Sequence, residues 1–469
     1  MTNNLLQLPS YNRGSCKAGI VHLGVGNFHR AHQAYYINEL IDKYEKNQWG
    51  IIGINLRENE RENFNFLKER DGKYVLKTIS TSGKKKYNEI HSIINLYDWS
   101  FNPKEAELVL GNPDIEIITM TVTESGYYIS ETGDLNLDLP IIKNNIEQKE
   151  QTIIFSFLRN ALKIRKQNCN KPITLLCCDN IRENGVMLKK ALNSYLLACN
   201  DGDLIDWINE NASFPSCVVD RITPKAPLNL KQEIKSEFNI NEKCSVMAEP
   251  FIQWVIEDNF IGKRPDLEKV GVQFTMNVLP YEEAKIRILN GGHVALSYLG
   301  ALKNLQTYDQ AINDNELQEF FFNLERKEII PSLGHNIPFD LEKYMLVIFD
   351  RFKNENIGDK LERIAMDGVS KFPIWILPLI KKCFEINIQP TNAIYAIAGW
   401  YIFMKKIFNK KLEFNYYEPR WEWVQQFLYE DKIIEFATCA ELWGNVPNIY
   451  PEFKTILNNQ ILELEKKYI

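Results

Sequence analysis

Three polar side chains with the chemistry of proton transfer lie close together in the segment "KIRILNGGHVAL", from Lys285 to Leu296. On an α-helix, Asn290 and His293 are three residues apart and share a face. Lys285 lies eight residues before His293, roughly 80° round the helix and about 12 Å along its axis. Such a helix presents an amine, an amide and an imidazole along a chain-like substrate. The alternative interpretation is a surface lysine, a buried polar pair and a flexible Gly-Gly turn.

The first half of the chain supplies the elements of a layered domain. Short apolar, β-rich runs alternate with helical segments such as "HRAHQAYYINELIDKY" and "TIIFSFLRNALKIRKQ". Apolar strands separated by helices predict a mostly parallel sheet that is covered on both faces. The predicted strands span residues 19–24, 49–55, 115–124 and 173–180. We therefore predict the α/β fold class with a Rossmann-type N-terminal domain.

The sequence pattern changes after Pro280, where helical periodicity dominates and few strand candidates remain. The helical segments include "YDQAINDNELQEFFFNLERKEII", "GDKLERIAMDG" and "NAIYAIAGWYIFMKKIF". We place one domain boundary near residues 275–285 and find no internal repeat. The expected domains are a Rossmann-type dinucleotide-binding domain at 1–280 and a mainly α-helical, substrate-binding and catalytic domain at 281–469.

A glycine-containing turn follows the first predicted strand. Gly24 and Gly26 stand where a Rossmann fold lets its backbone approach a pyrophosphate and where a helix N-terminus supplies N–H groups. His29 occupies the place of the third glycine of G-x-G-x-x-G, although the strand–turn–helix order supports the motif. We expect this turn to bind a dinucleotide, with contacts from Gly24, Val25, Gly26, Asn27, Phe28 and Arg30.

Charged side chains follow the second predicted strand, in "NLRENE". Glu58 or Glu60 would accept hydrogen bonds from the adenosine ribose hydroxyls and repel a 2′-phosphate, which favours NAD over NADP. Arg57 leaves this preference open, because a cation nearby can instead bind the phosphate. A solvated charged loop is the alternative interpretation of these residues.

The composition excludes several classes of partner. With 45% hydrophobic residues, a net charge of −6 and dispersed basic residues, the chain is globular and unsuited to nucleic acid. The one lysine run, Lys84 to Lys86, is interpreted as a solvated hairpin turn. The N-terminus lacks a secretory apolar core, and the apolar stretch 393–404 is too short to span a bilayer, so we expect a buried helix there. We expect a cytoplasmic protein without a membrane partner.

The cysteines and histidines do not indicate a metal site. The chain has nine cysteines and no Cys-x-x-Cys pair. Cys177 and Cys178 are adjacent within an apolar run and are predicted to be reduced, buried thiols. His29 and His32 suggest a metal pair, but no third ligand accompanies them, and we predict no metal.

Seven segments occur in an order that resembles one known family. They are "GIVHLGVGNFHRAHQAYY", "TVTESGY", "CDNIRENG", "FPSCVVDRITP", "EPFIQWVIEDNF", "KIRILNGGH" and "DGVSKFP". Together they resemble the polyol-specific long-chain dehydrogenases, the mannitol 2-dehydrogenase family. The resemblance implies a Rossmann-type domain, a helical C-terminal domain and catalysis in the cleft between them. It also implies NAD-linked oxidation of a secondary alcohol without a metal.

The resemblance further implies roles for individual residues. In the family motif K-x-x-x-x-N-x-x-H, Lys285 matches the general acid/base and His293 the residue that orients the substrate. Asn290 matches an asparagine that holds the reacting oxygen together with the one in "CDN", Asn180. Four other matches complete the set: Asp220, Arg363 and Lys371 correspond to positions that bind polyol hydroxyls, and Glu124 to a glutamate linked to proton exit. Asp220, Arg363 and Lys371 have a structural ion pair as their alternative interpretation.

Two departures from the family pattern affect substrate and cofactor. "CDNIRENG" has Arg182 and Glu183 where mannitol enzymes often carry Leu-Pro-His, and this version resembles the uronate reductases of the same superfamily. "NLRENE" has Glu60 where the mannitol enzymes place a cofactor-selecting aspartate, with Asn59 before it. The first departure leaves the substrate open, and the second leaves open the strength of the NAD preference.

The chemistry explains why a lysine and two amides are suitable. An unperturbed lysine has a pKa of about 10.4, too high for a base near neutrality. A closed site and the adjacent nicotinamide cation disfavour the ammonium, and we expect them to lower the pKa of Lys285 by roughly two to three units. Each amide that stabilises the developing alkoxide is worth roughly 3 kcal/mol. Gly291 and Gly292 allow close approach of the backbone.

We predict an NAD-dependent mannitol 2-dehydrogenase that interconverts D-mannitol and D-fructose, and that is a monomer or a weak homo-oligomer. Fructuronate reductase, acting on D-mannonate, and D-arabinitol dehydrogenase are the alternatives within the same enzyme class. A uronate carboxylate would require a cation, for which Arg182 is the candidate. A catalytically inactive NAD-binding regulatory protein is the alternative from a different class, although such a sensor has no need of a base.

Overall fold

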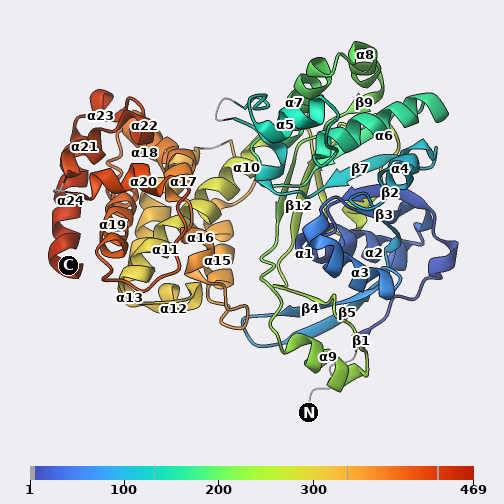
Figure 1. Cartoon of the computed structure of the whole chain (residues 1–469). Helices are drawn as coiled ribbons and strands as arrows, with labels where there is room; N and C mark the ends of the chain where they lie inside the picture. The colour runs from blue at the N-terminus through green and yellow to red at the C-terminus, as the bar shows by residue number, and fades with distance from the viewer. Residues whose placement is uncertain (1–5, 131–132, 335, 430–431) are drawn as a thin grey trace. The chain divides into compact units, whose positions relative to one another are not determined.

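The computed structural model describes the chain except for residues 1–5, 131–132, 335 and 430–431. The chain divides into two compact units, both visible in Figure 1. Unit 1 consists of Met1–Ser80 and Lys84–Leu279, and unit 2 consists of Thr81–Gly83 and Pro280–Ile469.

A six-stranded parallel sheet forms the centre of unit 1. The strand order is β6-β3-β2-β7-β8-β9, and every neighbouring pair is parallel. The strands are β2 (Ala18–Leu23), β3 (Gly50–Asn55), β6 (Ile93–Asp98), β7 (Ile117–Met120), β8 (Ile173–Cys177) and β9 (Ala212–Ser213). The order reverses between β2 and β7, and the carboxyl ends of strands at such a point are where doubly wound sheets bind ligands. The Rossmann-type prediction is confirmed.

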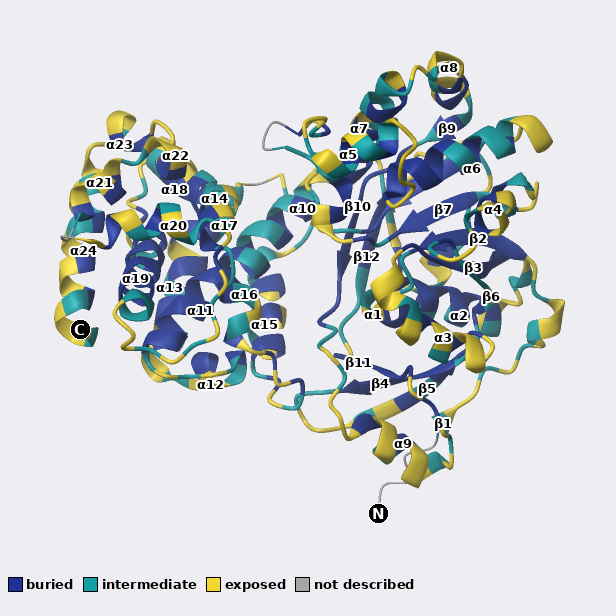
Figure 2. Cartoon of the chain, in the orientation of Figure 1, coloured by how far each residue is buried: buried dark blue, intermediate teal, exposed yellow. Residues whose placement is uncertain are grey.

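Helices cover both faces of this sheet because successive strand residues point to opposite sides. Ile20, Ile117 and Leu176 pack with α2 (Gln33–Tyr44). Ile118 and Leu175 pack on the other face with α6 (Ile154–Asn168) and α7 (Asn184–Ala198). Figure 2 shows the strands as buried and the outer helix surfaces as exposed. The remaining helices of unit 1 are α1 (Asn27–Ala31), α3 (Arg61–Glu69), α4 (Pro103–Leu108), α5 (Pro140–Ile146), α8 (Gly202–Asn211) and α9 (Leu230–Phe238).

Two smaller sheets complete unit 1. One has the order β1-β5-β4-β11 and the other β10-β12-β13. Their strands are β1 (Leu6–Gln7), β4 (Tyr74–Ile79), β5 (Lys85–Ile90), β11 (Val246–Ala248), β10 (Cys217–Asp220), β12 (Gln253–Glu257) and β13 (Gln273–Thr275). Lys84 precedes β5 at the predicted hairpin, whereas Lys85 and Lys86 belong to the strand itself.

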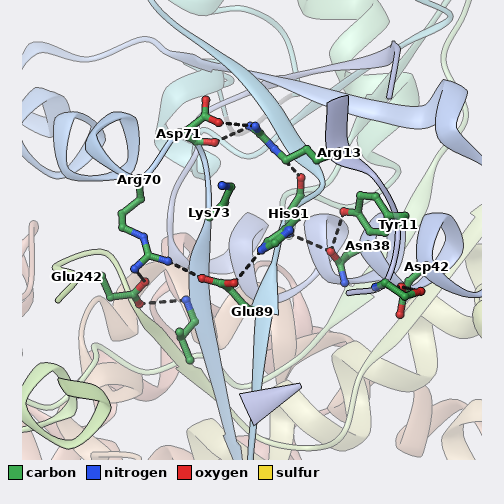
Figure 3. Close-up of polar contacts among 12 residues, drawn as sticks. Tyr11, Arg13, Asn38, Asp42, Arg70, Asp71, Lys73, Glu89, His91 and Glu242 are labelled. Carbon is green, nitrogen blue, oxygen red and sulfur yellow. Dashed lines mark hydrogen bonds and ion pairs between the residues drawn. The ribbon is translucent and has the colours of Figure 1, made fainter. Parts of the chain in front are cut away.

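Ion pairs tie the end of the β4–β5 hairpin to the neighbouring segments, as Figure 3 shows. Arg70 donates to Glu89, whose other oxygen lies 2.8 Å from His91 Nε2. Arg70 Nη1 also lies 3.8 Å from Glu242, whose side chain is fully buried. Arg13 donates to Asp71 and to the carbonyl oxygens of residues 91, 93 and 94. The network stabilises the sheet that contains β4 and β5, and it includes none of the candidate site residues.

Unit 2 is helical, and its described residues contain no strand. Its core surrounds α11 (Gly292–Leu302) and α19 (Thr391–Phe408), and α19 also packs against α24 (Glu452–Tyr468). The stretch 393–404 is buried within α19, as predicted. The other helices that the argument uses are α10 (Leu279–Ala284), α12 (Tyr308–Asn313), α13 (Asn315–Leu324), α15 (Leu341–Phe352), α16 (Leu361–Ala365), α17 (Gly368–Trp375) and α18 (Leu377–Glu385).

Some of the expected helical segments are divided or shortened in the structure. The segment expected to form one helix after β2 is divided at His32, whose φ of −122° and ψ of −86° end α1 before α2 begins. In "GDKLERIAMDG" the helix α16 covers only Leu361–Ala365, and the final glycine, Gly368, begins α17, because the glycine and aspartate residues near the ends of the segment favour turns.

The cysteines are all free thiols. Cys177, Cys178, Cys217, Cys244 and Cys383 are buried, and the others are partly exposed. Within the described part of the chain, no helix is long and apolar enough to cross a membrane.

Candidate active site

The turn after β2 brings the backbone to the place where the strand order reverses. Gly24 has a φ of +88°, and a Cβ there would lie 2.2 Å from the carbonyl oxygen of Thr121, so only glycine fits. Gly26 precedes α1 and faces open space, since the nearest atom to a Cβ built on it is 4.0 Å away. An open turn at a helix N-terminus and at a strand switch point fits the pyrophosphate of a dinucleotide.

His29 occupies the position of the missing third glycine. Its ring stacks on that of His22 with centroids 3.4 Å apart and an interplanar angle of 15°. His22 Nδ1 lies 2.7 Å from Thr119 Oγ1, and Nε2 lies 3.0 Å from Thr121 Oγ1. Burial lowers the pKa of His22 to about 3 and that of His29 well below its usual value, so both rings are neutral. Two flat rings thus achieve the close helix–strand packing that a glycine gives elsewhere.

Among the predicted cofactor contacts, Arg30 has a different environment. Gly26 and Asn27 are exposed and Val25 and Phe28 are half-buried, whereas Arg30 is buried. Arg30 donates to the carbonyl oxygen of Gly26 at 3.3 Å, to Asn27 Oδ1 at 2.6 Å and to the carbonyl oxygen of Cys244. The buried guanidinium therefore stabilises the turn at residues 24–27 from the protein interior.

The charged segment after β3 is exposed. Glu58 pairs with Arg61 at 3.4 Å, and Glu60 accepts from Asn63 Nδ2 at 3.3 Å. Arg57, which left the cofactor preference open, donates through Nη2 to the carbonyl oxygen of Val122 at 2.8 Å. That contact commits one edge of the guanidinium to the turn after β7.

Three further candidates of unit 1 lie at strand ends. Glu124 begins the short 3₁₀ turn Glu124–Tyr127 after β7, and Asn180 follows β8; both are exposed. Asp220 is the last residue of β10 and is buried. β10 begins beside the end of β8, because Cys217 Sγ donates to the carbonyl oxygen of Cys177 at 3.1 Å. Glu124 and Asn180 thus follow the ends of the neighbouring strands β7 and β8, and Asp220 lies at the far end of β10, three residues beyond the contact with β8.

The segment that carries Lys285 and Asn290 is a π-helix, which corrects the prediction of a continuous α-helix. It spans Lys285–Gly291 and continues into α11 at Gly292. In an α-helix, residues five apart are about 140° apart around the axis. In a π-helix, residues five apart are joined by the i→i+5 hydrogen bond and lie one turn apart on the same side. The extra residue therefore aligns Lys285, which is buried, with Asn290.

Glycine and a buried acid shape the junction between the π-helix and α11. A Cβ on Gly292 would lie 3.0 Å from Glu325 Oε1 and 3.1 Å from the Phe321 ring. Glu325 begins a second π-helical segment, Glu325–Ile329, which packs against the first. Burial raises the pKa of Glu325 well above its usual value and so favours the neutral acid. The close approach expected at Gly291 and Gly292 thus occurs at Gly292.

His293 is held between aromatic rings. Its ring centroid lies 4.2 Å from that of Phe352 and 4.5 Å from that of Tyr308, and its Nε2 lies 4.0 Å from Asp359 Oδ2. Burial, and then the charge of Arg363, lowers the pKa of His293 well below its usual value. A neutral imidazole in a fixed orientation suits a hydrogen-bonding role rather than a charged one.

Arg363 and Lys371 lie in the same neighbourhood of unit 2. Arg363 makes two hydrogen bonds to Asp359, both of 2.7 Å, and its side chain is 48% exposed. Lys371 Nζ donates to the carbonyl oxygen of Ile364 at 2.7 Å and to that of Met366. Both cations act on the pKa of His293. The structure thus brings His293, Arg363 and Lys371 together, although Arg363 is anchored by an ion pair to Asp359.

Two residues were not singled out from the sequence. Glu282 is buried and lies three residues before Lys285, hence on the same side of the helix. Asp179 stands directly before Asn180 and accepts hydrogen bonds from the turn that carries Glu124. The sequence offered one signal for each residue: Glu282 lies three residues before Lys285, and Asp179 is the aspartate of "CDN". No group of three or more side chains suited to a metal ion occurs among the described residues.

Comparison with known proteins identifies the family. The model of the mannitol dehydrogenase Rossmann domain matches residues 18–269, and that of the mannitol dehydrogenase C-terminal domain matches residues 277–452. The chain belongs to the mannitol dehydrogenase family. The family resemblance inferred from the sequence is confirmed.

Relatives within the mannitol dehydrogenase family differ in substrate and cofactor. The D-arabinitol 4-dehydrogenase of Klebsiella pneumoniae is 34% identical over 91% of this chain and 94% of its own length. The polyol:NADP oxidoreductase of Gluconobacter oxydans is 35% identical over 84% of this chain and 82% of its own length. The structure of Pseudomonas fluorescens mannitol 2-dehydrogenase, a ternary complex with NAD and D-mannitol, matches with a TM-score of 0.88 and 33% identity, over 98% of this chain and 94% of that one.

Proposed function

We propose that this protein is an NAD-dependent polyol dehydrogenase that interconverts D-mannitol and D-fructose, with Lys285 as the general acid/base. One observation carries the proposal: the π-helix aligns buried Lys285 with Asn290, and the neutral His293 follows at the start of α11. An amine, an amide and an imidazole in this order are suited to a secondary alcohol. Similarity to a mannitol 2-dehydrogenase over nearly the whole chain adds support.

The chain's own residues have separate roles in this proposal. The open turn at Gly26, with the exposed Glu58 and Glu60, would hold NAD, which when bound supplies the hydride acceptor. Lys285 is buried, and in this proposal its neutral amine takes the hydroxyl proton of the alcohol.

Amide and charged groups complete the proposed mechanism. The side-chain amides of Asn290 and Asn180 donate to the developing alkoxide, each worth roughly 3 kcal/mol. His293 orients the substrate, and Asp220, Arg363 and Lys371 bind hydroxyl groups along its chain. Glu282 lies on the same side of the helix as Lys285, and we assign it proton exchange with Lys285, while Glu124 is the proposed exit residue.

D-Arabinitol is the second candidate substrate. The similarity to the K. pneumoniae D-arabinitol 4-dehydrogenase is as extensive as that to mannitol enzymes and supports it. D-Fructuronate is the third, supported by Arg182 in "CDNIRENG", which is exposed. A buried carboxylate without a cation would cost several kcal/mol, so a uronate requires Arg182 in the site.

A substrate panel tests the proposal. Oxidation of NADH is followed with D-fructose, D-xylulose, D-fructuronate and D-tagaturonate, and we expect the highest kcat/KM with fructose. A kcat/KM for fructuronate that exceeds that for fructose by about tenfold, and that Arg182→Ala abolishes, would replace mannitol by mannonate. Preference for xylulose would indicate the arabinitol enzyme. Binding of NADH without turnover of any substrate would indicate the regulatory protein.

A further inference from the structure

The carboxylate of Asp179 holds the turn that follows β7. Its Oδ2 accepts from the backbone N–H of Val122 at 2.8 Å and from the hydroxyl of Tyr127 at 2.8 Å, and its Oδ1 accepts from the N–H of Thr123 at 3.1 Å. Tyr127 is itself fixed, because Cys177 Sγ donates to its hydroxyl at 3.0 Å. The side chain of Asp179, after β8, thus accepts hydrogen bonds from two consecutive N–H groups after β7, those of Val122 and Thr123.

The turn that Asp179 holds is strained. Thr123 has a φ of +69° and a ψ of 156°, a conformation that is populated almost only by glycine and costs about 1–3 kcal/mol for other residues. Thr123 is also exposed, so no side-chain packing enforces the conformation. The hydrogen bond from the N–H of Thr123 to Asp179 helps to offset this cost, together with the local bonds from the N–H of Gly126 to the carbonyl oxygen of Thr123 at 2.9 Å and between the hydroxyls of Thr123 and Ser125 at 3.3 Å.

Arg57 holds the same turn from the other side. Its Nη2 donates to the carbonyl oxygen of Val122, whose N–H donates to Asp179. The carbonyl oxygen and the N–H of Val122 therefore connect the segments that follow β3, β7 and β8. These strand ends lie at the edge of the sheet where the order reverses and where the proposed cofactor binds.

The turn and its anchor flank two candidate site residues. Glu124 follows Thr123 directly, and Asn180 follows Asp179 directly. We propose that Asp179 is a positioning residue: its carboxylate holds Thr123 in the strained turn and thereby fixes Glu124 and Asn180 relative to each other. This inference rests on the proposed function, because it assigns Asp179 a role in that reaction.

The ionised form of Asp179 is the one that can hold the turn, because a protonated acid loses acceptor capacity. Removal from water raises the pKa of Asp179 to about 6, against the opposing effect of the hydrogen bonds from Val122 and Tyr127. The group is therefore ionised near neutrality and protonated in mild acid. The titratable and charged groups around it are Glu124 and Tyr127 in the turn, Cys177 at the end of β8 and Cys178 directly after it, Arg57 beyond Val122, Arg182 and Glu183 before α7, and Cys217 on β10.

The test compares Asp179→Asn with wild type and with Asp138→Asn, a matched change at an exposed surface carboxylate. We expect Asp179→Asn to lower kcat by about tenfold or more, with the KM for NADH changed less than about threefold and Asp138→Asn unchanged. Thr123→Gly removes the strain, so the double variant Thr123→Gly/Asp179→Asn should recover at least about threefold of the lost kcat. The ratio of wild-type to Asp179→Asn kcat should also narrow below about pH 6, because wild type then loses its carboxylate.

Amide hydrogen exchange gives a readout that does not depend on turnover. The N–H groups of Val122 and Thr123 should exchange faster in Asp179→Asn, and the melting temperature should change by no more than about 3 °C. A kcat within about twofold of wild type would overturn the proposal, as would unchanged exchange at these two amides. If wild type turns over no substrate of the panel, the proposed function fails, and the exchange measurement alone decides whether Asp179 holds the turn.

Discussion

Lys285 is the residue on which the proposed chemistry depends most directly. It is buried at the start of a π-helix, with Asn290 one turn further on. We expect Lys285→Ala to lower turnover by at least ~100-fold, because a positioned base is lost, while NADH binding stays nearly intact. Steady-state kinetics and fluorescence titration with NADH measure the two effects. Lys381→Ala, an exposed lysine of the same unit, is the control, and a loss below about tenfold in Lys285→Ala would remove Lys285 from the mechanism.

We expect single residues to set the preference between NAD and NADP as well. Glu58 and Glu60 are exposed after β3, and Arg57 is engaged with the carbonyl oxygen of Val122. We expect wild type to prefer NAD over NADP, and Glu60→Ala to narrow the difference in kcat/KM by about tenfold by removing a charge that repels the 2′-phosphate. Kinetics with both cofactors measure it, with Glu62→Ala as the control. Equal or better activity of wild type with NADP would contradict the prediction.

At the scale of elements, the junction between the π-helix and α11 has little room. A Cβ on Gly292 would meet Glu325 Oε1 at 3.0 Å and the Phe321 ring at 3.1 Å. We expect Gly292→Ala to cost about 1–3 kcal/mol of stability, as overpacking does, and to lower kcat by about tenfold because His293 follows directly. Gly202→Ala is the matched control, since a Cβ there meets nothing within 4 Å.

A second substitution distinguishes crowding from other causes. Glu325→Ala removes the oxygen that a Cβ on Gly292 would meet, so Gly292→Ala/Glu325→Ala should be less damaged than the sum of the single variants. Thermal unfolding and kcat measured through the double-mutant cycle test this coupling. Additive effects would show that the two side chains do not compete for the same space.

The elements were predictable from the sequence to different degrees. Apolar strands alternating with helices predicted the parallel sheet, and the buried 393–404 stretch predicted α19, because both patterns are local. The π-helix was not predictable, because the apolar residues of "KIRILNGG" fit an α-helix equally well. The insertion is supported by contacts with a second π-helical segment, Glu325–Ile329, which is distant in the sequence.

In the candidate site, too, local sequence patterns were predictable, whereas contacts between residues distant in the sequence were not. The glycine turn and the Lys285 segment carried recognisable spacings, whereas the roles of Arg30 and Arg57 depend on carbonyl groups of Cys244 and Val122 that no sequence pattern connects to them. The anchoring of the turn by Asp179 likewise depends on the adjacency of β7 and β8 in the sheet. The roles of the site residues are predictions from family resemblance and geometry.

At the scale of the whole molecule, acid sensitivity should arise partly from Glu233. Its carboxylate accepts from Lys77 at 2.8 Å and from Lys85 at 2.7 Å, and also from the hydroxyl of Tyr87. Burial acts to raise the pKa of Glu233, but these hydrogen bonds outweigh it and lower the pKa to about 2. A pKa lowered by folding adds stability above the unfolded value of about 4.5, and this stability is lost as the pH falls towards about 2.

We therefore expect Glu233→Gln to destabilise the protein near neutrality by about 2 kcal/mol, through the loss of charged hydrogen bonds. The difference from wild type should shrink as the pH is lowered below about 4.5. Thermal unfolding across this pH range measures it, with Glu210→Gln, an exposed acid of α8, as the control. A difference that is independent of pH would assign the effect to packing instead of charge.

Both units contain buried cysteines, so the reactivity of these native thiols can report the unfolding of each unit separately. Cys177, Cys178, Cys217 and Cys244 report on unit 1, and Cys383 reports on unit 2. Burial raises the pKa of Cys177 and Cys178 well above its usual value and that of Cys383 to about 12, so these thiols stay unreactive while they are enclosed. Pulsed alkylation read by peptide mass spectrometry would then time the opening of each unit separately, without an engineered label. Unequal labelling rates would show which unit opens first when the enzyme inactivates.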